Sequence, residues 1–281
     1  MSVIRELQEQ LQQTETTKFV TTMLRDISAT RLQAIRAEFE ANTAYYSELH
    51  QLMNLIKRYA AEAGVSLELG AGPRRVYVAL TANRRFYGHL NTDVMKLLHE
   101  RLATETDAAG YVIGQTGQQY VEADGAQWPV LPTVALFAND IPEPAEVRSV
   151  IAALRTYTEV MVIHPSYINS FRQEAVVTDI THQPALHSSH ERPTVDYLFE
   201  PDLPALLHFF REQVRAVLFQ RVLLETRLAF TGARLMKMQR ARERAAELVR
   251  QERRTIHKQI STIQSMRLLE TFTGFHSDRT L

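Results

Sequence analysis

The sequence predicts an α/β fold with long helices, in which an antiparallel coiled coil of the N- and C-terminal helices accompanies a small Rossmann-like α/β domain. Residues 3–62 contain neither glycine nor proline, and residues 205–272 contain one glycine and no proline. Between them, short strand-like runs alternate with helical ones. We therefore expect an N-terminal coiled-coil helix over 1–64, an α/β domain over 73–200 and a C-terminal coiled-coil helix over 201–276.

The N-terminal segment carries apolar residues in steps of three and four, close to the heptad spacing of a coiled coil. These residues are Ile4, Leu7, Leu11, Val20, Met23, Leu24, Ile27, Leu32, Ile35, Phe39, Tyr46, Leu49, Leu52, Met53 and Ile56. The stripe is interrupted at 12–18, "QQTETTK", where the core-facing side becomes polar. A helix of this length would extend roughly 85–90 Å, which is more than a small domain needs. Gly64 is the expected C-cap.

The middle segment shows the alternation of an α/β sheet with parallel strands. Strands are expected at 76–81, 111–114, 132–138, 158–163 and 170–179, and helices at 91–107 and 142–157. We interpret "GQTGQQY" (114–120) as a turn and "HQPALHSSHERP" (182–193) as a polar loop.

The C-terminal segment begins after "PDLP" (201–204) and continues an apolar seam to its end. The seam consists of Leu206, Phe210, Val214, Val217, Leu218, Leu224, Leu228, Leu235, Met238, Leu248, Ile256, Ile260 and Ile263. Two helices too long to be buried by a small middle domain most simply pack on each other in antiparallel orientation.

Composition excludes several classes of function. Thirty-two basic residues balance thirty-two acidic ones, so no overall charge field favours nucleic acid. The chain has no cysteine, which excludes disulfides and thiolate chemistry. The polar start "MSVIRELQEQ" does not resemble a secretory leader, and no apolar run reaches the roughly 20 residues needed to cross a bilayer. We expect a soluble, cytoplasmic chain whose link to a membrane comes through partners.

The sequence offers no self-contained active site, and we predict no catalytic, cofactor-binding or metal-binding residues. "GQTGQQY" lacks the lysine of a phosphate-binding P-loop. His182, His187 and His190 have spacings that zinc could use, but they lie in the predicted loop without the four close ligands of a structural site. We interpret these histidines as solvated.

A basic stripe marks the C-terminal helix, with nine Lys or Arg against three Glu from 232 to 258. Its members are Arg234, Lys237, Arg240, Arg242, Arg244, Arg250, Arg253, Arg254 and Lys258. It can be a solvated helix face, a surface for an acidic protein partner or a nucleic-acid site. The interleaved aromatic residues that would stack on bases are missing, so nucleic acid is the least favoured of the three.

The order of motifs resembles the gamma subunit of the F-type ATP synthases. "LTANRRFYGHLNTDVMK" (80–96) is similar to the family's Thr-Ser-Asp-Arg-Gly-Leu-Cys-Gly-Gly-Leu-Asn segment, with matches at Thr81, Arg84, Gly88, Leu90 and Asn91. "YLFEPD" (197–202) resembles the signal that opens the family's C-terminal helix, and "VIHPSYINSFRQEAVV" resembles a family strand. Further matches along both long helices are Thr21, Met23, Ala29, Arg31, Leu32, Glu225, Arg234, Met238, Ala241, Ala245 and Leu248.

The chain also departs from the family pattern, as a divergent member would, for example one from an alternative or sodium-type F-ATPase. Asn83 stands for the family's Asp and Tyr87 for its Cys, while Arg85 and His89 replace glycines. Those two residues must avoid positive φ or accept strain. We expect Asn91 or Thr92 to cap the helix that follows. "ERRTIHKQI" (252–260) replaces an Arg-Gln element that the family associates with rotor contacts.

The resemblance implies a central-stalk subunit that performs no bond chemistry and couples ion flow to ATP synthesis or hydrolysis. Its implied partners are the alpha and beta subunits of the hexamer, the epsilon subunit and the c-ring, in a peripheral complex on the cytoplasmic side of the inner membrane. The implied partner-contact residues are Met23, Arg84, Gly88, Asn91, Arg234, Met238, Arg253 and Arg254. The alternatives are a coiled-coil scaffold or adaptor without ATPase partners, and an α/β domain with helical arms that binds a small molecule.

Overall fold

The computed structural model describes residues 2–64, 75–84, 86–105, 107–123, 125, 127–139, 141–181, 200 and 202–277. The chain divides into two compact units, Met1–Ser28 with Leu235–Leu281, and Ala29–Arg234. We call them the helical unit and the sheet unit. The predicted division into three segments stays a prediction.

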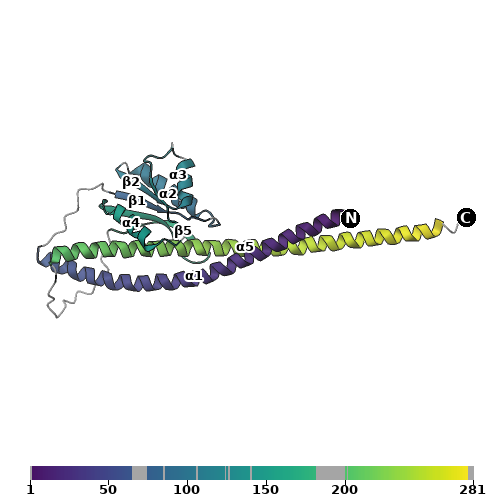
Figure 1. Cartoon of the computed structure of the whole chain (residues 1–281), viewed down its shortest axis with the longest axis horizontal. Coiled ribbons are helices and arrows are strands. Elements are labelled where there is room, and N and C mark those ends of the chain that lie inside the picture. The colour runs from purple at the N-terminus through teal and green to yellow at the C-terminus, as the bar shows by residue number, and fades with distance from the viewer. Residues whose placement is uncertain are drawn as a thin grey trace. The chain divides into compact units, whose positions relative to one another are not determined.

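Two long helices account for about half of the chain (Figure 1). Helix α1 runs over Ser2–Glu62 and helix α5 over Leu203–Ser277, with 61 and 75 residues. The polar run 12–18 does not interrupt α1, because its threonine hydroxyls donate to carbonyls four residues earlier in the same helix. Gly64 follows α1 with φ +70°, as expected of a glycine at a helix C-terminus.

The two helices pair in antiparallel orientation within each unit. In the helical unit, Thr14 Oγ1 donates to Glu252 Oε1 at 3.0 Å and Arg253 Nη2 to Glu15 Oε1 at 2.5 Å. In the sheet unit, the Arg221 guanidinium lies 5.6 Å from the centre of the Tyr46 ring. Residue numbers that rise along α1 meet numbers that fall along α5, which confirms the predicted antiparallel coiled coil.

Several buried positions of α1 recur every seven residues, at Thr21, Ser28, Ile35, Leu49 and Ile56. Two of these residues are polar, and each satisfies its hydroxyl by donating to a carbonyl one turn back in the same helix. The apolar stripe predicted from the sequence is therefore partly wrong. Its members Val20, Met23, Ile27 and Leu52 are exposed, and so is Leu248 of α5.

The sheet has five strands in the order β3-β2-β1-β4-β5. The strands are β1 (Arg75–Leu80), β2 (Ala108–Ile113), β3 (Thr133–Ala135), β4 (Glu159–Tyr167) and β5 (Gln173–Asp179). The pairs among β1, β2, β3 and β4 are parallel, as predicted, but β5 runs antiparallel to β4. The five-residue connection 168–172 is too short for a parallel crossover, so the prediction of a purely parallel sheet was wrong at this edge.

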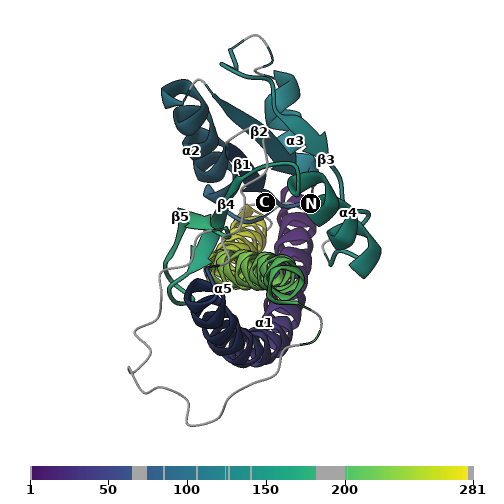
Figure 2. The same cartoon turned by 90° about the vertical axis from the view of Figure 1, so that its left-hand side faces the viewer.

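The sheet is covered on both faces (Figure 2). Val76, Val78 and Leu80 of β1 pack toward α4 (Pro144–Leu154) and the long helices. Tyr77 and Ala79 pack toward α2 (Leu90–Thr104) and α3 (Gln115–Ala123). This alternation follows the two-residue period of a strand and gives the sheet unit two hydrophobic layers.

The turn predicted at 114–120 is wrong, because residues 115–123 form α3. Its two glycines are required by close packing. A Cβ on Gly114, whose φ is +112°, would lie 2.3 Å from the carbonyl oxygen of Thr81. A Cβ on Gly117 would lie 2.4 Å from Val112 Cγ1. The glycines therefore let α3 approach the ends of β1 and β2.

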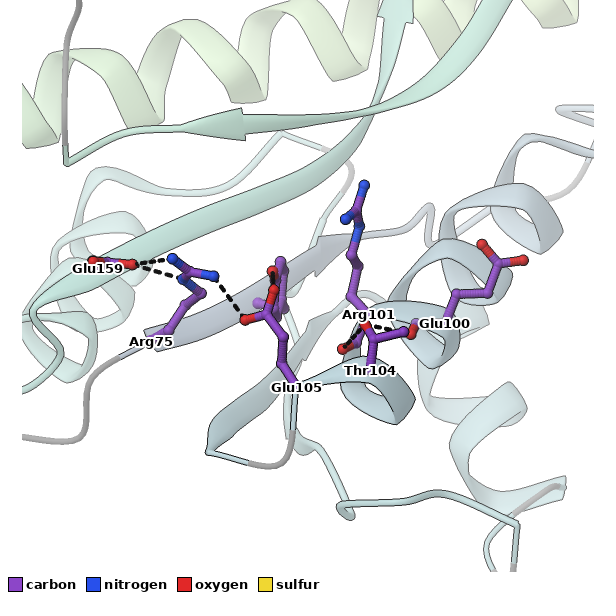
Figure 3. A network of polar contacts seen from close by, with 7 residues as sticks. Arg75, Glu100, Arg101, Thr104, Glu105 and Glu159 are labelled. Atoms are coloured by element: carbon purple, nitrogen blue, oxygen red, sulfur yellow. Dashed lines mark hydrogen bonds and ion pairs between the residues drawn. The ribbon is translucent and has the colours of Figure 1, made fainter.

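A polar network ties β1, β4 and the end of α2 together (Figure 3). The Arg75 guanidinium donates to Glu159 Oε2 at 2.6 Å and to Glu105 Oε2 at 2.7 Å. The Tyr77 hydroxyl donates to Glu105 Oε1 at 2.7 Å. One guanidinium therefore bonds to both carboxylates, and they raise its pKa.

Candidate partner-contact surface

The segment from 81 to 90, which we call the corner, joins β1 to α2 and is held by hydrogen bonds to side chains. Gly117 N donates to Thr81 Oγ1 at 2.9 Å, and Gln115 N donates to Asn83 Oδ1 at the same distance. Ala82 N donates to Asn91 Oδ1 at 3.0 Å. These bonds fix the corner against the first turns of α2 and α3.

The expected helix cap at Asn91 or Thr92 was wrong. Helix α2 begins at Leu90, and the N-cap residue is His89, which makes no side-chain cap bond. The Asn91 side chain reaches back to the end of β1, and the Thr92 hydroxyl bonds to the Tyr120 hydroxyl. Asn91 therefore joins β1 to α2.

Backbone strain in the corner lies at Phe86, whereas the sequence indicated Arg85 and His89. Phe86 has φ +78°, and among the described residues other than glycine it alone has a positive φ. His89 avoids the left-handed region with φ −94°, and Gly88 occupies it with φ +69°. Arg85 lies outside the described residues. The backbone strain therefore lies at an aromatic residue, Phe86, that is 51% exposed.

An aromatic cluster supports the corner from α5. Tyr87 is buried, with its ring 4.8 Å from the ring of Phe230, and the Arg234 guanidinium lies 4.9 Å from the Tyr87 ring centre. This cation–π contact makes Arg234 a structural residue of the sheet unit. The corner turns Arg84 and Phe86 outward while Tyr87 anchors it inward.

In the helical unit, the structure separates the remaining predicted contact residues. Met238 is 4% exposed and belongs to the helix seam, whereas Met23 is 48% exposed on α1. Arg253 is paired with Glu15, and Arg254 is exposed. Met23, Arg253 and Arg254 are therefore exposed, and Met238 alone of these four is buried.

The exposed apolar side chains of α1 include Val20, Met23 and Ile27, which the sequence predicted to lie in the coiled-coil seam. Phe19, Val20, Met23 and Ile27 lie within nine residues, and their exposed fractions are between 46% and 65%. A seam residue would be buried, so these residues form an apolar strip on the outside of the helical unit. Tracing the heptad through Thr21 and Ser28 would have identified it.

Most of the basic stripe is solvent-exposed, and the exceptions are Arg234 and Arg242, which are half-buried. Near it lies an open groove of about 640 Å³ between α1 and α5, lined by Glu15, Lys18, Phe19, Thr22, Ala246, Val249, Arg250 and Arg253. The groove combines cationic rims with an exposed aromatic ring. These features suit a protein partner that carries acidic groups.

Within the described residues, no three His, Asp or Glu side chains come together as metal ligands. The histidines at 182, 187 and 190 lie outside the described residues, and so does most of the "YLFEPD" motif. None of the described helices has a stretch long and apolar enough to cross a membrane.

Comparison with known proteins links this architecture to one family. The ATP synthase (ATP-synt) family model matches residues 3–259. The ATP synthase gamma chain of Moorella thermoacetica is 25% identical over 262 residues, with 89% of each chain covered. A chain in the structure of the Euglena gracilis mitochondrial ATP synthase (OSCP/F1/c-ring, rotational state 3) matches with a TM-score of 0.67 and 14% identity, covering 100% of this chain and 97% of that one. A chain of the rotor of the same synthase matches with a TM-score of 0.62 and 13% identity, covering 93% and 99%.

Proposed function

Because this chain belongs to the gamma family of the ATP synthases and is a central-stalk rotor subunit, we propose how it couples ion flow to ATP synthesis or hydrolysis. The paired helices enter the alpha/beta hexamer, and each beta subunit meets a different face of them. Rotation of the pair then changes which beta subunit is held open or closed, which is coupling by differential contact.

The observation that carries the proposal is the antiparallel pairing of two helices of 61 and 75 residues. Each helix supports the other through a seam that recurs every seven residues, and ion pairs between the helices flank this seam. A paired helix resists bending and twisting better than a single one, so the pair can transmit torque.

We assign the partner contacts to exposed residues of both units. On the helical unit these are the apolar strip with Met23, together with Arg254 and the exposed part of the basic stripe. On the sheet unit they are Arg84, Phe86 and Gly88 of the corner. Asn91, Arg234 and Met238 support these surfaces from inside and act on partners only indirectly.

The proposed partners are the alpha and beta subunits, the epsilon subunit and the c-ring, in a complex on the cytoplasmic side of the inner membrane. The chain is part of a peripheral assembly, and its link to the membrane sector runs through these partners. The acidic partner suggested by the basic stripe is, in this proposal, a surface of the hexamer that slides past exposed arginines.

Co-purification tests the proposal. The tagged full-length chain, expressed from its own host, should retain alpha and beta chains through a wash at physiological salt. A chain recovered alone as a homo-oligomer would instead support the coiled-coil scaffold. Met23→Asp with Ile27→Asp is the informative variant, because it places charges on the exposed apolar strip without touching the buried seam.

A further inference from the structure

Arg215 is a buried cation in the sheet unit that the rotor function does not explain. It lies on α5, and only 6% of its surface is exposed. A guanidinium stays protonated at any physiological pH, so burying it is costly unless an anion neutralises it. Arg215 therefore needs a counter-charge.

Among the residues that the structure describes, the charged groups around Arg215 do not supply one fully. Glu212, Arg211, Arg155 and Asp179 all act electrostatically on its guanidinium. Glu212 forms an ion pair with Arg155 at the end of α4, with Oε2 2.6 Å from Nε, but this oxygen accepts no hydrogen bond from the described residues. Asp179 Oδ1 accepts a hydrogen bond from Thr181 N at 2.7 Å. Arg155, Arg211 and Arg215 thus share the carboxylates of Glu212 and Asp179, which leaves one positive charge of this group without a counter-charge.

Two donors of this cluster are also left without acceptors. The Nε atoms of Arg211 and Arg215 are both buried, and neither has a hydrogen-bond partner in the part of the chain that the structure describes. Arg211 and Arg215 are separated by one helical turn, so their side chains share one face of α5. A buried donor without an acceptor costs free energy, and two on one helix face indicate a missing ligand.

We propose that Arg211, Arg215 and Arg155 form a binding site for a small oxyanion, meaning a phosphate or a carboxylate group. Guanidinium groups recognise such anions through paired N–H donors, and one added negative charge balances three cations against two carboxylates. The site lies where the end of α4, the end of β5 and the start of α5 meet. Its occupancy would tie the start of α5 to the ends of α4 and β5.

Thermal unfolding of the full-length chain tests the site, with sodium phosphate or sodium acetate compared with sodium chloride at equal ionic strength and pH. Phosphate stabilises most proteins by exclusion from their surface, so the readout is the difference between variants. We expect phosphate or acetate to raise the unfolding midpoint of the unmodified chain by at least about 3 °C more than that of Arg211→Gln. The anion that produces this difference identifies the ligand group.

Arg148→Gln is the matched control, because Arg148 is an exposed arginine of α4 outside the cluster. It should respond to each anion like the unmodified chain. Arg215→Met gives a second signature. In chloride its midpoint should rise by about 2–4 °C, since a buried apolar side chain replaces an unneutralised charge, and its extra response to oxyanions should vanish. Equal responses of the unmodified chain and Arg211→Gln, or a midpoint for Arg215→Met in chloride that falls, would overturn the proposal.

Discussion

At the scale of single residues, position 117 requires a glycine because neighbouring atoms leave no room for a Cβ, and not because of its backbone conformation. An alanine there would gain about 1 kcal/mol of helix propensity. Its Cβ would, however, lie 2.4 Å from Val112 Cγ1 and 2.7 Å from Thr81 Oγ1, and relieving such overlap in a packed core costs about 1–3 kcal/mol.

We therefore predict that Gly117→Ala lowers the free energy of unfolding, by about 1–2 kcal/mol once both effects are counted. Urea denaturation measures it. Gly125→Ala is the control, because a Cβ there would come no closer than 3.5 Å to another atom and should change stability by less than about 0.5 kcal/mol. A neutral Gly117→Ala would show that α3 can move away from the sheet.

At Phe86 and Gly88 the opposite holds. The positive φ of the backbone, and not the space around the residue, determines which residue types are tolerated there. A Cβ on Gly88 meets nothing within 4 Å, yet its φ of +69° disfavours any side chain. Phe86 already bears that cost at φ +78°. We predict that Gly88→Ala destabilises the chain by about 1 kcal/mol, and that Phe86→Gly stabilises it or leaves it unchanged.

The same denaturation experiment separates stability from function at this position. Phe86→Gly should weaken the retention of beta chains in co-purification even though its stability does not fall, because the exposed ring is assigned to a partner contact. Loss of stability together with full retention of partners would contradict both assignments. Phe171→Gly is a useful comparison, since Phe171 is another exposed ring of the sheet unit, at 77% exposure.

At the scale of elements, the Arg75 network links β1 and β4 to the end of α2 through titratable groups. The hydrogen bond from Tyr77, followed by the hydrogen bond and charge of Arg75, lowers the pKa of Glu105 below its ordinary 4.5, although burial opposes the shift. A carboxylate whose pKa is lower in the folded chain stabilises the fold above its unfolded-state pKa. That contribution disappears as the pH falls through the folded-state value.

We predict that the free energy of unfolding decreases from about pH 5 downward, and that Glu105→Gln shows a shallower decrease over this interval. Urea denaturation at a series of pH values gives the two curves. Glu100→Gln is a suitable control, because Glu100 is an exposed glutamate of the adjoining helix α2. Parallel curves for the unmodified chain and Glu105→Gln would contradict the stabilising role of this carboxylate.

At the scale of the whole molecule, substitutions of two neighbouring arginines of α5 should distinguish an effect on the stability of the helix pair from an effect on partner contact. Arg253 is paired with Glu15 of α1, so Arg253→Glu disturbs the helix pair as well as the surface. Arg254 is exposed, and Arg254→Glu alters only the surface charge. We predict that Arg254→Glu lowers the coupled ATPase activity of the assembled complex a fewfold without changing the stability of the isolated chain.

Lys237→Glu makes the same charge reversal at another exposed position of the stripe and shows whether the effect depends on position. Raising the salt concentration should reduce the difference between the Arg254 variant and the unmodified complex, because exposed charges are screened. Unchanged coupling in Arg254→Glu would remove this arginine from the partner contacts.

The sequence by itself determined the long helices, their antiparallel pairing, most strands and the family. Glycine-free and proline-free runs of this length, and alternation of strand and helix periods, are local properties of the chain. Motifs in a fixed order carried the family resemblance.

Only the tertiary structure decided which face of each element is buried. Thr21 and Ser28 are polar, so hydrophobicity does not identify them as seam positions. They can be buried because their hydroxyls are satisfied within the helix. The sequence predicted a turn at Gly117, because a glycine is a common turn residue. Its close packing against Val112 became visible only in the structure. Asn91 and Arg234 are predicted contact residues, and only the structure shows that Asn91 accepts a hydrogen bond from Ala82 N and that Arg234 lies over the Tyr87 ring. Burial depends on what lies opposite, and that is set by contacts between segments distant in the sequence.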